Sequence, residues 1–286
     1  MTSPKLHHYV PRFYLKRFAV RNDRFWVWDK RTEKVFETTP YSVAAEKHFY
    51  GTPDLIGTKH DPLIIERQLS ELEGNASRIT SMWINSFDLL RPMDSFPVSL
   101  DERRQMSLFL SVQFLRTAEE RDILALFAAE RGYYESGISL QEKNNLHLQM
   151  LSNSGLVETI AEWIDQSIWI IARNGTETPF WTSDNPVAFK RRDNRMWLKA
   201  GIMGLGSYVA FPISPRYILY CKEPTYWAKL KKFDCCLSPV ELTSEMVQHE
   251  NAGQVFMATR FVISSAEDFS FATEFAKSIG TDVYAP

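Results

Sequence analysis

The pattern of apolar and polar positions divides the chain into a β-rich start, a helical middle and a β-rich end. Two short β-prone runs, residues 24–29 and 35–38, flank a charged turn and predict a β-hairpin. Asp61 followed by Pro62 is a typical helix start, and apolar residues then recur every three or four positions as far as residue 87. This period predicts a helix with one buried face, formed by Ile65, Leu69, Leu72, Ala76, Ile79, Trp83 and Phe87.

Two Ser-x-x-Glu capping boxes, at residues 99–102 and 139–142, predict the starts of the next helices. The first predicted helix continues to about Arg131, just before a glycine. The second helical stretch ends near Gln166 and is interrupted near Ser154. The central part of the chain, about residues 61–166, is therefore expected to be helical.

From residue 168 onward the pattern changes to short β-prone runs separated by turn signals. We expect a helix at 240–257, a strand at 260–263 and a last helix at about 266–279. Because strands and helices occur in separate runs, the sequence predicts a single α+β domain over residues 1–286, with an antiparallel β-meander after the helices. The predicted strands of the meander are 168–172, 180–182, 187–189, 196–198, 208–211 and 217–220.

The charge and cysteine content restricts the class of protein. Lysine and arginine total 33 and aspartate and glutamate 35, so the formal net charge is −2. This balance excludes a general polyanion binder but allows a local basic groove. Cys221, Cys235 and Cys236 match no zinc or disulfide spacing, and no apolar run approaches the roughly 20 residues that span a bilayer. We therefore expect a reduced, cytoplasmic setting and no membrane partner.

The opening segment carries the cluster that is best suited to chemistry. It reads His-His-Tyr-Val-Pro-Arg-Phe-Tyr-Leu over residues 7–15. His7 and His8 could give or take a proton near neutral pH. Arg12 could bind a phosphate or carboxylate through two hydrogen bonds, and Tyr14 adds a hydroxyl donor.

The conformation of this segment determines which of its side chains meet. Pro11 disfavours a helix at the preceding residue, so residues 6–20 are predicted to be extended. On a strand His8 and Arg12 share a face and His7 points away, so at most one histidine should line a pocket with Arg12. The alternative is a buried strand whose polar groups bind only to backbone. Either way we expect the segment to be buried through Leu6, Val10, Phe13, Leu15 and Phe18.

Three further polar groups could contribute to a site. Gln113 and Arg116 lie three residues apart on an otherwise apolar helix face, where they line a polar cavity or bind a neighbouring loop. Residues 46–50 place an acid, a histidine and a tyrosine in a predicted loop. The third group is a turn that could place Asp184 as a catalytic carboxylate or metal ligand, and it consists of Thr182, Ser183, Asp184 and Asn185 before Pro186.

Several of these segments resemble, in order, a widespread microbial family of domains of unknown function. The resemblance covers about residues 7–264 and implies a single domain without implying an activity. Members often carry glutamine where this chain has Arg12, which argues against a catalytic role for Arg12 itself. The matching segments are the opening His-His-Tyr-Val-Pro box, His48-Phe49-Tyr50, Gln113-x-x-Arg116-Thr117, the Thr-Ser-Asp-Asn-Pro box with its flanks at 180–187, and Phe-Pro-Ile-Ser-Pro at 211–215.

The residue inventory favours an intracellular hydrolase, and within that class a phosphodiesterase or nuclease acting on a nucleic acid or nucleotide. In this hypothesis His7 or His8 is the acid or base, Tyr14 is a donor and Asp184 orients a group or binds a metal. Substrate binding is assigned to Arg12, Gln113, Arg116, Thr182, Ser183 and Asn185.

The competing hypothesis is a non-catalytic binding module in which the same polar groups form a structural network. The cofactor is unknown, with a divalent metal as one option. We expect an atom of His7, His8, Arg12 or Tyr14 to lie within hydrogen-bonding reach, directly or through one water, of residues 182–185, because buried polar groups need partners.

Overall fold

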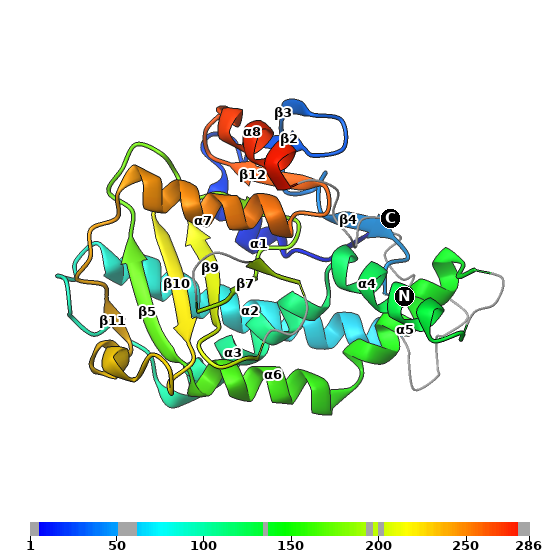
Figure 1. The fold of residues 1–286 in the computed structure, drawn as a ribbon, viewed down its shortest axis with the longest axis horizontal. Coiled ribbons are helices and arrows are strands. Elements are labelled where there is room, and N and C mark those ends of the chain that lie inside the picture. The colour runs from blue at the N-terminus through cyan, green and yellow to red at the C-terminus, as the bar shows by residue number, and fades with distance from the viewer. Residues whose placement is uncertain (1–5, 51–61, 134–136, 193–196, 200–202, 280–286) are drawn as a thin grey trace.

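The computed structural model describes residues 6–50, 62–133, 137–192, 197–199 and 203–279. It combines antiparallel sheets with a helical middle and C-terminal helices, so the α+β prediction is confirmed (Figure 1). Within the described residues, no helix combines the length and the apolar composition needed to cross a bilayer.

The helices begin largely where the local signals place them. Both predicted capping boxes form, with Glu102 and Glu142 each bound to the N-cap serine. The apolar stripe of the first long helix is buried or packed against the core, although the predicted N-cap Asp61 lies outside the described residues. These helices are α2 (Pro62–Phe87), α3 (Leu100–Leu115), α4 (Ala118–Glu130), α5 (Leu140–Leu151), α6 (Ser154–Gln166), α7 (Ser244–Met257) and α8 (Ser270–Ile279).

The continuous helix expected as far as Arg131 is wrong, because it is divided into α3 and α4. Arg116 leaves the helical conformation with φ −88° and ψ 10°, and Thr117 follows with an extended backbone. The Thr117 side chain accepts a hydrogen bond from the Glu120 backbone N–H, which starts α4 as a new helix. A threonine at an N-cap satisfies one of the free N–H groups of a helix start, and this favours a break at that position.

Six strands form the larger sheet in the order β11-β5-β10-β9-β7-β8, and all pairs except the parallel β11–β5 pair are antiparallel. Consecutive strands of the predicted meander are neighbours in the pairs β7–β8 and β9–β10, whereas β9 pairs with β7 and not with β8. The predicted residue 196 lies outside the described part of β8. The strands are β5 (Ile168–Arg173), β7 (Ala188–Lys190), β8 (Trp197–Leu198), β9 (Tyr208–Ser214), β10 (Tyr217–Lys222) and β11 (Cys236–Leu237).

A four-stranded sheet of order β3-β2-β12-β6 joins the two ends of the described chain. The predicted hairpin is present as β2 and β3, and β12 pairs with β2 from the C-terminal part. β6 belongs to this sheet and not to the meander. The strands are β2 (Phe25–Asp29), β3 (Lys34–Thr38), β6 (Thr182–Ser183) and β12 (Phe261–Ser264).

The opening segment is extended only as far as His8, so the prediction of an extended segment over residues 6–20 is wrong beyond that point. Strand β1 (Leu6–His8) pairs with β4 (Ala45–Lys47), and helix α1 (Arg12–Leu15) continues into a 3₁₀ turn at Lys16–Phe18. Pro11 is the N-cap of α1, and its carbonyl accepts hydrogen bonds from two following backbone N–H groups. A proline at a helix start loses no helical hydrogen bond, so here it begins a helix.

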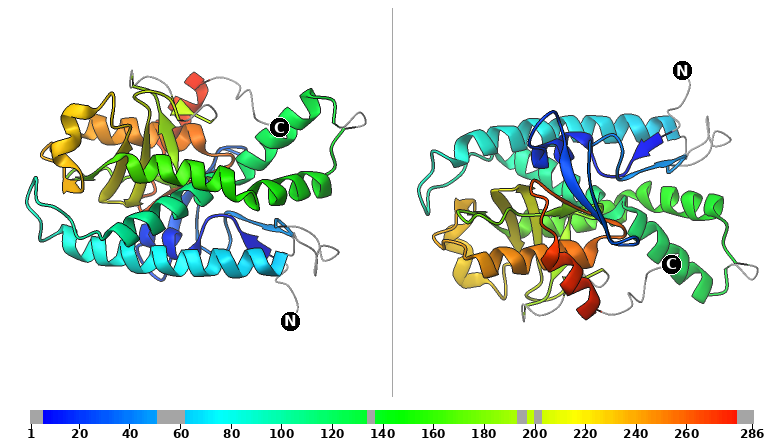
Figure 2. Two further views of the ribbon diagram at one scale, coloured as in Figure 1. Left: turned by 90° about the horizontal axis from the view of Figure 1, so that it is seen from below. Right: turned by 90° about the horizontal axis from the view of Figure 1, so that it is seen from above.

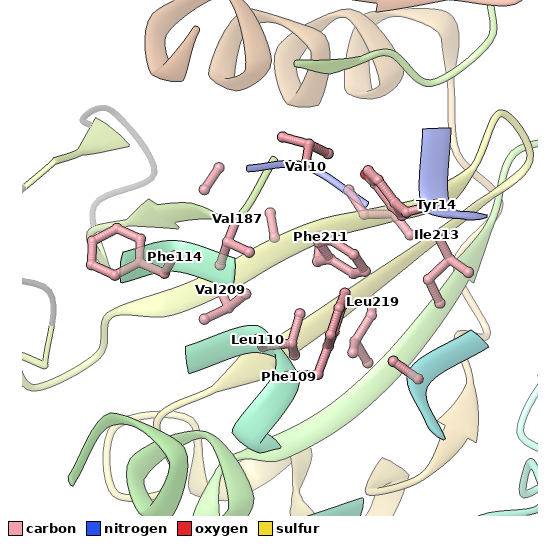
Figure 3. Close-up of a cluster of buried hydrophobic side chains, with 14 of the residues drawn as sticks. Val10, Tyr14, Phe109, Leu110, Phe114, Val187, Val209, Phe211, Ile213 and Leu219 are labelled. Atoms are coloured by element: carbon pink, nitrogen blue, oxygen red, sulfur yellow. The ribbon is translucent and has the colours of Figure 1, made fainter. Parts of the chain in front are cut away.

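This segment lies between α2 and the larger sheet (Figure 2). α7 covers the other side of the sheet, α3 packs against α2, and α6 packs against α3. Figure 3 shows Val10 and Tyr14 over Phe211 and Ile213 of β9. The expected burial is confirmed for Val10, Leu15 and Phe18, whereas Leu6 is 46% exposed because β1 lies outside the main sheets.

Asp184 connects the turn after β6 to the start of β12. Its side chain is buried, and its two carboxylate oxygens accept hydrogen bonds from the backbone N–H groups of Thr259, Arg260 and Phe261 at 3.0, 2.9 and 3.1 Å. Burial raises the pKa of Asp184 to about 7, while the three N–H donors lower it. This carboxylate is thus part of the fold's internal hydrogen bonding.

We expect Asp184→Asn to lower the free energy of unfolding by about 2 kcal/mol, because the amide NH₂ would face a backbone N–H donor. Urea denaturation of the full chain measures this change. Asp23→Asn is the matched control, since Asp23 is exposed and its loss should cost less than about 0.5 kcal/mol. An Asp184→Asn protein as stable as the wild type would contradict the anchoring role.

Candidate functional site

A pocket of about 750 Å³ lies between the opening segment and α2. The opening segment contributes His7, His8, Arg12 and Lys16, and α2 contributes Glu66 and Glu73. The expectation that at most one histidine lies beside Arg12 is wrong. Strand alternation ends at His8 and α1 begins at Arg12, so both histidines line the same pocket.

His7 is held by protein groups at both ring nitrogens. Nδ1 accepts a hydrogen bond from the Tyr50 backbone N–H at 3.1 Å, and Nε2 lies 2.8 Å from Glu66 Oε1. Because Nδ1 is an acceptor, the ring proton is on Nε2, the nitrogen that lies beside the carboxylate. The ring is buried and stacks on Tyr50 with centroids 5.5 Å apart. His7 is therefore arranged to fix Tyr50 and Glu66.

His8 is arranged differently. Its Nε2 has no hydrogen-bond partner among the described residues. Burial lowers the pKa of His8, the positive charge of Arg12 lowers it further, and hydrogen bonds to the backbone of Tyr41 and Pro40 oppose both effects. A half-buried neutral imidazole with one unpartnered nitrogen can accept a proton from a bound molecule.

The side of the pocket formed by α1 is cationic. Arg12 is exposed, and its guanidinium carbon lies 4.4 Å from the centroid of the Tyr41 ring. Lys16 follows one helical turn later and forms an exposed ion pair with Asp23 at 2.7 Å. Stacking on an aromatic face leaves the edge of a guanidinium available for hydrogen bonds to an anion.

The side formed by α2 carries two carboxylates that are bound to protein groups. Burial raises the pKa of Glu66, which faces His7. Glu73 Oε1 accepts a hydrogen bond from Arg116 Nη1 at 2.8 Å, and Gln113 Oε1 accepts from Nε and Nη2 of the same guanidinium at 2.9 and 2.7 Å. Gln113 in turn donates to the Tyr9 carbonyl at 3.1 Å. Arg116 is fully buried, so these contacts fix Glu73 at the edge of the pocket.

The opening box and the 182–185 turn do meet, as expected, but away from this pocket. Tyr14 Oη lies 2.7 Å from Thr182 Oγ1 and donates to the Pro212 carbonyl at 2.7 Å. Ser183 donates to Gln254 Oε1 at 2.9 Å. The Asn185 side chain is fully buried and has no hydrogen-bond partner among the described residues. Together with Asp184 these groups lie inside the fold.

The α2 carboxylates and Lys16 were not predicted from the sequence. Glu66 and Glu73 are seven residues apart, and this spacing places two acids on one helix face beside the apolar stripe. Lys16 lies four residues after Arg12, which becomes informative only once the segment is known to be helical. No group of three or more potential metal ligands occurs among the residues that the structure describes.

We expect Tyr14→Phe to lower the free energy of unfolding by about 1–3 kcal/mol, because the Pro212 carbonyl and the Thr182 hydroxyl would lose a buried partner. Thr182→Val and the double variant complete a thermodynamic cycle. Tyr14 has one proton, which it donates to Pro212, so Thr182 must donate to Tyr14. If the loss of unfolding free energy in the double variant equals the sum of the losses in the two single variants, the direct contact between Tyr14 and Thr182 is contradicted.

Comparisons with known proteins bear on identity only at the level of the family. No curated protein and no solved structure matches the chain. A family model described as "Protein of unknown function (DUF4238)" matches residues 6–268, a span that includes the pocket and both polar boxes. The chain therefore belongs to this family.

Proposed function

We propose that the chain is a hydrolase of phosphate esters, a phosphodiesterase or nuclease, with His8 as its acid–base residue. The observation that supports this most is the unpartnered His8 Nε2 in a pocket that also carries Arg12. The other polar groups of the opening box, His7 and Tyr14, are bound to the protein itself.

The acid–base step follows from the lowered pKa of His8. At neutral pH the imidazole is mainly neutral, and Nε2, which is buried and has no hydrogen-bond partner among the described residues, is the ring nitrogen assigned to proton transfer. Nε2 would take the proton from an attacking water or hydroxyl as that oxygen bonds to phosphorus. The imidazolium would then return the proton to the departing oxygen, so the ring ends the cycle unchanged.

Phosphate binding is assigned to the cationic side of the pocket. Arg12 and Lys16 are exposed and lie one turn apart on the same segment. An arginine can bind two phosphate oxygens at once, and a lysine adds a mobile charge. Tyr41 is 53% exposed and offers a ring on which a nucleobase could stack. A nucleotide-sized substrate fits a pocket of about 750 Å³.

The remaining residues of the sequence hypothesis receive positioning roles in this proposal. Arg116 and Gln113 position Glu73, and Tyr14 and Thr182 hold α1 on the sheet. The cofactor remains open, so a divalent metal belongs in the assay as a separate condition.

The second candidate is a module that binds a phosphorylated ligand without turnover. It is favoured by the extent of the internal bonding, because Tyr14, Gln113, Arg116, Thr182 and Asp184 all bind other protein groups. Both candidates use the same pocket and the same cationic side. They differ in whether proton transfer at His8 matters.

We expect His8→Gln to reduce turnover at least 10²-fold while the melting temperature changes little, since glutamine keeps the size and the hydrogen bonding but cannot exchange a proton. RNA, DNA and nucleotide substrates are assayed with and without divalent metal. His7→Gln is the matched control, and it should lower the free energy of unfolding by about 1–3 kcal/mol because both ring nitrogens are engaged.

Two results separate the candidates. The first is that the wild type turns over none of these substrates but binds phosphate, and that Arg12→Met weakens this binding. This result would favour the binding module over the hydrolase. Wild-type turnover that His8→Gln leaves unchanged would remove His8 from the mechanism.

Arg12→Met should raise the pKa of His8, because it removes the nearby positive charge that disfavours the imidazolium. NMR titration of the His8 ring checks this without any assay of activity. If turnover is present, the acid limb of its pH profile should move to higher pH by the same amount. An unchanged His8 titration would show that the charge of Arg12 does not reach the ring.

A further inference from the structure

A second pocket, of about 510 Å³, lies among the helices of the middle region. Helices α3 to α6 all contribute to it, mainly through apolar side chains such as Phe114, Ile123 and Ile160. Phe127 and Met203 at its rim are 41% and 42% exposed. A pocket of this size with an apolar lining suits a small ligand when a few polar groups fix the orientation.

Glu120 is the acidic group of this lining, and its position is unusual. The residue is buried, and its Oε1 has no hydrogen-bond partner among the described residues. It occupies the third position of α4, where a glutamate commonly binds back to the N-cap, as Glu102 and Glu142 do in their helices. In α4 the Thr117 cap forms without that reciprocal bond, so the Glu120 carboxyl group does not bind back to the N-cap.

The charges around Glu120 explain what the pocket would bind. The neighbouring Glu119 is buried, with Oε1 2.6 Å from Lys199 Nζ and Oε2 accepting a hydrogen bond from Thr259 Oγ1 at 2.9 Å. Glu119 therefore has partners for both oxygens. Among the described groups at this position there are two carboxyl groups and one ammonium group, so when Glu120 is ionised one more positive charge would neutralise the set.

We propose that this pocket binds an amphipathic amine, with the apolar body among the helix side chains and the ammonium group on Glu120. An ammonium group supplies both things that Glu120 lacks, which are a hydrogen-bond donor and a counter-charge. An anionic or purely apolar ligand would supply neither. The proposal involves none of the residues assigned to the phosphate-ester site.

The protonation of Glu120 is consistent with this ligand. Burial raises the pKa of Glu120 well above its usual value, Glu119 raises it further and Lys199 lowers it. Without a ligand the carboxyl group is therefore protonated more readily than an exposed glutamate. Since the ammonium group binds the ionised form, amine binding should release a proton and strengthen as pH rises toward the pKa of Glu120.

The space beyond the pocket allows a longer apolar body. A neighbouring cavity of about 410 Å³ shares Leu124 and Phe127 with the pocket that Glu120 lines, and it extends along α4 to Arg131. An unbranched alkyl chain could follow this path away from Glu120. Arg131 at the far end also disfavours a second cationic group there, so the proposed ligand carries a single amine.

The test is isothermal titration calorimetry of the full chain with n-octylammonium, n-octanol and octanoate, which share a chain length and differ in head group. We expect the wild type to bind n-octylammonium at least tenfold more tightly than the other two. Glu120→Gln should remove this preference while octanol binding changes less than about twofold, because the shape of the pocket is kept and the charge is lost.

Two control variants complete the design. Glu130→Gln removes a carboxylate from an exposed position of the same helix and should leave octylammonium binding unchanged. Leu124→Trp places a large ring at a position that lines both cavities and should weaken binding of all three ligands. Leu124 is only half-buried, so this variant is expected to fold.

The proposal is overturned if n-octylammonium does not bind the wild type, if octanoate binds as tightly, or if Glu120→Gln keeps the preference for the amine. A preference lost equally in Glu130→Gln would assign it to the general charge of α4 and would also overturn the proposal. None of these outcomes depends on turnover at the His8 pocket, so the two proposals fail separately.

Discussion

The hydroxyl group of Tyr14 holds together three segments that are far apart in sequence. It donates to the carbonyl of Pro212 in β9 and accepts from Thr182 in β6, while its ring stacks on Phe211 at 5.0 Å. These contacts fix α1 on the sheet, and the pocket exists because α2 lies on the other side of the same short segment. The chemistry assigned to His8 and Arg12 therefore depends on a hydrogen bond that is itself remote from any substrate.

Local signals predicted those elements that local interactions determine. Capping serines and the apolar stripe of α2 located most helices because a cap and a packed face each act within a few turns. Two of the wrong predictions have local causes as well. Thr117 and Glu120 repeat the pattern of the other capping boxes, and Pro11 stands where a proline can begin a helix as readily as it ends one. The sequence carried both signals, but each also permitted another interpretation.

The site could be predicted only in part, because its decisive contacts join distant residues. The opening box identified His8 and Arg12 by chemical type. The pairing of His7 with Glu66 depends on how α2 packs against β1, and no local pattern specifies that contact. Nor could residue type alone distinguish His7 from His8. The distinction arises because one ring has two partners, whereas the other keeps a nitrogen without one among the described residues.

The junction between α3 and α4 connects the two pockets. In one continuous helix Gln113, Arg116 and Glu120 would share a face, since they are three and four residues apart. The break at Thr117 separates them, so that Gln113 and Arg116 support the His8 pocket and Glu120 lines the other. The same junction carries Glu119, which accepts a hydrogen bond from Thr259, and the Thr259 backbone N–H binds Asp184. A ligand that alters the charge near Glu120 would thus act on a chain of hydrogen bonds that reaches the start of β12, whereas the contacts of Arg116 lead to α2. Occupation of one pocket can therefore influence the other through the backbone of the junction, and also through Arg121 of α4, which binds Glu46 opposite His7 in the β1–β4 pair.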